Sequence, residues 1–174
     1  MESSTGSFLS GVALALAGFV IKEAATTQMK TYRLRKVLIA DAESTVSGLT
    51  AHGETLPTLA KAIEDGGAPS FIWEGQDSGA QPPFLADVPI HLSPTETKLA
   101  LDFYAAQGRI AAIRDEFNGA VRGIVTDPTN GPSFGKIAKA CVHDLQRNYV
   151  EACATGNSLA AELKARLWQD DYDG

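Results

Sequence analysis

Residues 93–124 decide the fold, and they carry the sequence SPTETKLALDFYAAQGRIAAIRDEFNGAVRGI. The stretch opens with a helix-start signal, because Ser93 can cap the first turn, Pro94 suits the first helical position, and Glu96 can return a hydrogen bond to the cap. Apolar residues follow at alternating spacings of four and three: Leu99, Phe103, Ala106, Ile110, Ile113, Phe117, Ala120 and Ile124. This heptad seam, typical of a coiled coil, predicts a helix that packs along another helix.

A second helix with the same rhythm follows a turn-rich stretch at residues 126–132. Its seam positions are Phe134, Ala138, Cys141, Leu145, Asn148 and Ala152. We therefore predict an αα-hairpin in which Ile110 and Ile113 are buried between helices 95–124 and 133–153.

The last helix is expected to be separate from the hairpin. Gly156 and Asn157 predict an interruption, since glycine and asparagine commonly end helices. Ser158 then caps a final helix with Leu159, Leu163 and Leu167 on one face.

The N-terminal end holds an apolar run of 14 residues, FLSGVALALAGFVI at 8–21, within an uncharged stretch of 19 residues. As a helix the uncharged stretch reaches about 28 Å, close to the roughly 30 Å hydrocarbon core of a bilayer. Only Ser10 interrupts the apolar run, whereas an ordinary core helix keeps one polar side. We therefore predict a single transmembrane helix, with residues 1–22 as a membrane anchor.

Two alternatives to the transmembrane helix stay open. One is a helix buried inside a soluble fold, because apolar runs of this length are common in protein cores. The other is a cleaved signal peptide, which the small residues at 15–17 would suit, although the basic stretch that begins such peptides is missing.

Basic residues gather directly after the apolar run. Residues 22–36 contain Lys22, Lys30, Arg33, Arg35 and Lys36 against one acid, Glu23, for a net charge of +4. Positive charge beside a span marks its cytoplasmic side, so we expect a single-pass protein of the inner or plasma membrane with a cytoplasmic C-terminal domain. Three of these residues, Arg33, Arg35 and Lys36, are expected near the lipid headgroups.

Small residues inside the run are spaced four apart, as Gly11 with Ala15 and Ala13 with Ala17. This spacing lets helices approach closely in lipid, which makes a homo-oligomer a candidate arrangement.

Two helices are expected between the anchor and the hairpin. Residues 23–65 predict a juxtamembrane helix from about 26 to 50, and then a short helix from about 57 to 64. Nothing between Ile21 and Thr26 stops a helix, so the anchor and the juxtamembrane helix can form one rod. His52 and Gly53 offer its stop signal.

Residues 66–92 predict an irregular apolar loop, since they hold four of the eight prolines and no sustained helical period. The fold class is therefore all-α: one transmembrane helix, then a small helical bundle with an αα-hairpin in residues 93–174 and one long Pro/Gly-rich loop. The large apolar side chains of residues 66–92 favour docking of this loop on some surface. The candidate partner-binding residues are Phe71, Ile72, Trp73 and Phe84; the alternative, which the sequence favours, is that the loop covers one side of its own bundle.

Catalytic, metal and cofactor motifs are not found. A net charge of −6 argues against nucleic acid as a partner, and two cysteines are too few for a disulfide framework. Cys141 and His143 are two apart and point to different sides of a helix. Residues 131–136 resemble a phosphate-binding loop only loosely, because the glycine spacing is short and Ile137 follows the lysine.

The sequence thus favours a non-enzymatic, membrane-tethered cytoplasmic helical module that positions or regulates a protein partner. One alternative is an accessory subunit of a membrane enzyme, or an enzyme with a pocket under the 66–92 loop. Another is a soluble helical bundle that binds a small apolar ligand.

Overall fold

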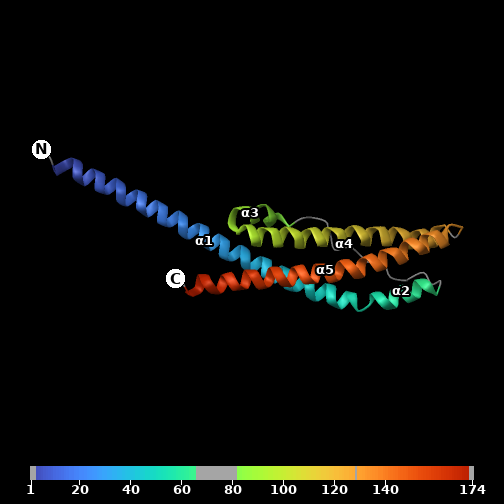
Figure 1. Cartoon of the computed structure of the whole chain (residues 1–174). Helices are drawn as coiled ribbons and strands as arrows, with labels where there is room; N and C mark the ends of the chain where they lie inside the picture. The colour runs from blue at the N-terminus through green and yellow to red at the C-terminus, as the bar shows by residue number, and fades with distance from the viewer. Residues whose placement is uncertain (1–2, 66–81, 128, 173–174) are drawn as a thin grey trace.

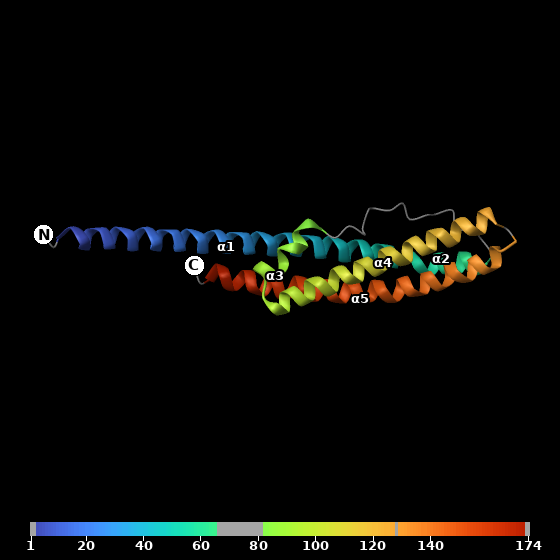
Figure 2. The ribbon, with the colours of Figure 1, turned by 90° about the horizontal axis from the view of Figure 1, so that it is seen from above.

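The computed structural model describes the backbone of residues 3–65, 82–127 and 129–172, and the side chains of residues 19–65, 82–127 and 129–167. Within these ranges it contains helices and no strand, which confirms the all-α class. The elements in chain order are α1 (Ser3–Gly53), α2 (Leu56–Glu64), the 3-10 helix η1 (Pro83–Ala86), α3 (Val88–His91), α4 (Pro94–Thr126) and α5 (Gly131–Tyr172). The long helices α1, α4 and α5 run along one another, with the short elements beside them (Figures 1 and 2).

The hairpin of α4 and α5 is the largest packing unit, as predicted. The cap that starts α4 forms as expected: the Glu96 amide donates to Ser93 Oγ at 3.3 Å, and the Ser93 amide donates to Glu96 Oε2 at 2.8 Å. Along the seam Ile110 is buried and Ile113 packs half-buried against the same cluster. The periodicity therefore identified the correct pair of helices.

Helix α5 packs along α1 as well as along α4. One apolar cluster lies toward the hairpin turn and includes Leu49, Phe117 and Leu145. The other lies where η1 and α3 cover the start of α4 and includes Leu38 and Phe103. Together the two clusters form the core, one toward each end of the packed helices.

The predicted interruption at Gly156 and Asn157 is wrong, because α5 continues unbroken to Tyr172. A Cβ at Gly156 would lie 2.7 Å from Val46 Cγ2 and 2.8 Å from Phe103 Cε2. Glycine is needed here because α1 and α4 approach α5 too closely for a side chain. Ser158 caps no helix, and its hydroxyl donates to the Ala154 carbonyl oxygen at 2.9 Å.

The predicted irregular loop also needs correction at its second half. Residues 83–86 form η1 and residues 88–91 form α3, each with a proline in its first turn, where the missing N–H costs nothing. Buried Leu85, Val88 and Leu92 join the core between α1 and α4. Residues 66–81 lie outside the described part of the chain.

Helix α1 ends at Gly53, as predicted, and is continuous over 51 residues. Its N-terminal part extends well beyond the rest of the molecule (Figures 1 and 2). We call residues 3–30 the N-terminal arm; the side chains of 19–30, which are the described ones, are all exposed. Among the described side chains of α1, Leu34 is the first that is buried.

The transmembrane helix predicted within residues 1–22 gains no support. Among the residues that the structure describes, none of the helices is both long and apolar enough to cross a membrane. The side chains of residues 1–18, where most of the predicted anchor falls, lie outside the described part.

Candidate functional site

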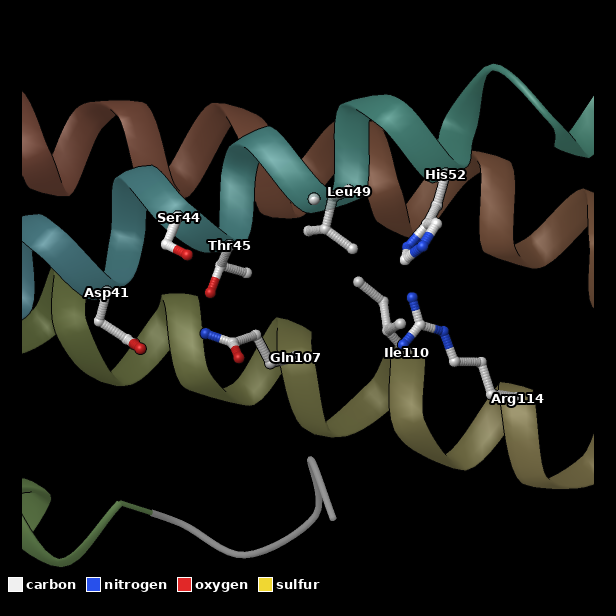
Figure 3. A pocket seen from close by; sticks show the side chains of 9 residues that line it. Asp41, Ser44, Thr45, Leu49, His52, Gln107, Ile110 and Arg114 are labelled. Atoms are coloured by element: carbon white, nitrogen blue, oxygen red, sulfur yellow. The ribbon is translucent and has the colours of Figure 1, made fainter. Parts of the chain in front are cut away.

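A polar groove opens between α1 and α4 (Figure 3). It encloses about 370 Å³, a volume within the usual range for small-molecule sites. Its lining residues are Asp41, Ser44, Thr45, Gly48, Leu49, His52, Gln107, Ile110 and Arg114. Buried Leu49 and Ile110 belong to the core, so the groove has an apolar middle between two polar ends.

One end of the groove is built around Asp41. The Tyr104 hydroxyl donates to Asp41 Oδ2 at 2.6 Å, across from α4 to α1. Burial and the neighbouring Asp41 carboxylate both hold the pKa of Tyr104 well above its ordinary value, so the hydroxyl stays a donor. Phe103 and Phe84 pack edge-on against Tyr104 with ring centroids at 5.2 and 6.0 Å, which fixes the tyrosine ring.

The other end of the groove carries His52 and Arg114, whose side chains face each other in Figure 3. Arg114 donates from Nε and Nη2 to the Tyr149 hydroxyl, at 3.1 and 2.6 Å. Its guanidinium also lies 5.4 Å from the Tyr149 ring centroid. Tyr149 thus orients the charge of Arg114 at this end of the groove.

Gln107 lies near the Asp41 end of the groove, across from Thr45 (Figure 3). Its Nε2 is buried and has no hydrogen-bond partner. Buried amide donors in native proteins are nearly always paired with protein or water. The Gln107 amide therefore leaves one hydrogen bond to be made by water or by a ligand in the groove.

The ion pair of Arg35 with Glu96 lies at the beginning of α4, outside the groove. Arg35 Nε donates to Glu96 Oε1 at 2.9 Å, and the Glu96 side chain is completely buried. Burial works against the charged form, but the hydrogen bonds from Ser93 and the charge of Arg35 outweigh it, so the pKa of Glu96 lies below its ordinary value. Arg35, which we expected near lipid headgroups, therefore points into the bundle instead.

The predicted partner-binding residues are only partly described. Phe71, Ile72 and Trp73 lie outside the described part of the chain. Phe84 is half-buried and packs against the cluster of Leu38 and Phe103. It is therefore the one member of the predicted set whose contacts are known, and those contacts are with its own bundle.

Cys141, a seam residue of the predicted hairpin, is buried. Burial and the negative charges of Glu116 and Asp144 raise the pKa of the Cys141 thiol to about 11. His143 is exposed on another side of α5. Over the described ranges, no three His, Cys, Asp or Glu side chains are grouped as metal ligands would be.

The residues of the groove were not predicted, although a signal was present. Asp41, Ser44, Thr45, Gly48 and His52 recur on α1 at spacings of three and four. Such spacings place them on one helix face. On α4, Tyr104 and Gln107 stand three apart beside the apolar seam. The two stripes of polar residues flank the seams, and only their meeting across α1 and α4 shows that they form a site.

Comparison with known proteins found no matching family model, no similar curated protein and no similar solved structure.

Proposed function

We propose that this chain is a membrane-tethered helical module, non-enzymatic, whose bundle positions or regulates a protein partner on the cytoplasmic side. The observation that carries the proposal is the N-terminal arm. Phe19, Val20 and Ile21 are 66%, 63% and 68% exposed, and no described element of the bundle covers them. They continue the apolar run that begins at Phe8.

The exposed apolar side chains of the N-terminal arm favour binding of the arm to another apolar surface. Each of these large side chains gains about 1.5 to 3 kcal/mol when it is fully buried. A bilayer suits the run best, because Phe8–Ile21 is apolar on nearly every face rather than along one stripe. A protein partner normally covers only one stripe of a helix.

Basic residues next to the arm support the same proposal. Lys22, Lys30, Arg33 and Lys36 are exposed, and their spacing places them within an arc of about 120° on α1. Each can contribute about 1 kcal/mol of attraction to an anionic lipid surface. With Arg35 paired inside the bundle, these four residues form the basic stripe that would lie at the membrane.

The bundle itself is held at a fixed place relative to the arm. Helix α1 runs without interruption from Ser3 to Gly53, so the arm and the packed part of α1 are one element. A rod of this kind would hold the bundle close to the membrane surface. We propose the segment that carries Phe71, Ile72 and Trp73 as the surface that meets the partner.

Alkaline carbonate washing of membranes from cells that express the full chain tests the tether. We expect the wild type to stay in the membrane pellet and the double variant V12K/V20K to be released. The matched control is V125K/V150K, since Val125 and Val150 are 67% and 73% exposed on the bundle and undergo the same change. Release of the wild type, or equal release of both double variants, would contradict the proposal.

A reporter fused after Gly174 tests the orientation. We expect a reporter that works only in the cytoplasm to be active. Activity of a reporter that works only outside the cytoplasm would refute the cytoplasmic placement.

A further inference from the structure

We infer that the groove between α1 and α4 binds a free α-amino acid with an apolar side chain. The inference is independent of the membrane tether, because it rests on the packed part of the bundle. It follows from three unfilled bonding positions at one end of the groove and from the apolar residues in its middle.

The first unfilled position is the buried Nε2 of Gln107, which has no acceptor. Figure 3 shows the Gln107 side chain reaching into the groove beside Thr45. The N–H groups of Gln107 Nε2 need an anionic or carbonyl oxygen as their acceptor. A ligand carboxylate provides such an oxygen.

The second position is the Thr45 hydroxyl. Several other helical threonines, including Thr26, Thr50 and Thr126, donate to the carbonyl oxygen four residues earlier at 2.8 to 2.9 Å. Thr45 is half-buried and forms no such bond in the structure. Its hydroxyl can therefore donate to the same carboxylate as Gln107.

The third position is the carboxylate of Asp41. Its hydrogen bond comes from the neutral Tyr104 hydroxyl, and no lysine or arginine of the described residues forms an ion pair with it. A half-buried carboxylate with a free oxygen next to two donors fits a ligand ammonium group. Asp41 and Thr45 are four residues apart on α1, so an ammonium and an adjacent carboxylate can be met by the same helix face.

The rest of the groove suits the side chain of such a ligand. Leu49 and Ile110 form the apolar middle, next to the Asp41 and Gln107 end. The enclosed volume of about 370 Å³ leaves room for an aliphatic side chain of leucine size.

Isothermal titration of the purified full chain with L-leucine tests the inference. Two analogues separate the contacts: 4-methylpentanoate lacks the amine that Asp41 would bind, and 3-methylbutylamine lacks the carboxylate that Gln107 and Thr45 would bind. We expect L-leucine to bind at least about tenfold more tightly than either analogue. No heat from L-leucine at millimolar concentration, or equal affinity for all three compounds, would overturn the inference.

Two variants connect the binding to the groove. Gln107→Leu keeps the size of the side chain and removes the unpaired donor, so the protein should fold at least as stably as the wild type while its affinity for L-leucine falls about tenfold or more. Asp41→Asn should remove the preference for L-leucine over 4-methylpentanoate. The matched control is Gln146→Leu, because Gln146 is half-buried on α5 and does not line the groove. Unchanged L-leucine affinity in Gln107→Leu would refute the site.

Discussion

Arg35 on α1 and Glu96 on α4 form an ion pair across 61 positions of sequence, with Nε 2.9 Å from Oε1. Glu96 has 0% exposure, and the same carboxylate accepts the Ser93 amide at the start of α4. One side chain therefore caps α4 and fastens it to α1. The same two helices line the groove.

Loss of Arg35 should leave a buried carboxylate without its cation. We expect Arg35→Met to lower the free energy of unfolding by about 3 to 5 kcal/mol. The matched control is Arg33→Met, since Arg33 is exposed on the same helix and should change stability by no more than about 0.5 kcal/mol. Urea unfolding of the full chain in detergent measures both variants, and equal stabilities would show that the pair contributes nothing.

The pair also predicts how stability depends on pH. The pKa of Glu96 lies below its ordinary value in the folded protein. The folded state therefore binds the proton less readily than the unfolded state, and the stabilisation is fully present above the ordinary pKa of about 4.3. It is lost as the pH falls through the folded pKa. Thermal unfolding between neutral and acid pH should show a smaller acid destabilisation in Glu96→Gln than in the wild type, and parallel curves would contradict this.

Gly156 should be intolerant of any side chain. The methyl of Gly156→Ala would meet Val46 and Phe103 at 2.7 and 2.8 Å, which forces α1 or α4 away from α5. We expect a loss of about 1 to 3 kcal/mol in the free energy of unfolding. Gly119→Ala is the control, because nothing lies within 4 Å of its added methyl and alanine favours the helix by up to about 1 kcal/mol. The two variants should therefore shift the melting temperature in opposite directions.

The hairpin seam makes a separate prediction. Ile110→Asp would place an unpaired charge at a position that is 3% exposed, at a cost of several kcal/mol against a typical total of about 5 to 15 kcal/mol. Leu101→Asp changes a residue of the same helix that is 48% exposed and should be nearly neutral. Circular dichroism on heating distinguishes them, and an unchanged melting curve for Ile110→Asp would mean that the seam is not packed.

The hairpin was predictable because its signals are local. Ser93 and Glu96 form their bonds within one turn, and a heptad seam needs no knowledge of distant residues beyond the presence of a partner helix. The interruption at Gly156 was predicted wrongly because glycine has two uses, ending a helix and allowing close approach. Only the positions of Val46 and Phe103 show which one applies.

The groove was not predictable for a related reason. Asp41, Thr45 and Gln107 look like ordinary polar residues at the flanks of two seams. Their importance arises from α1 and α4 both packing on α5 while a gap stays open between them. Arg35 was misplaced similarly, because a basic residue in a basic stretch gives no local sign that it pairs with Glu96.

Flotation of the purified full chain with liposomes tests the membrane tether most directly. We predict that the wild type floats with vesicles of mixed neutral and anionic phospholipid, that V12K/V20K stays at the bottom of the gradient, and that V125K/V150K floats like the wild type. Wild-type protein that stays at the bottom, as a monomer or as a self-associated species, would contradict the tether.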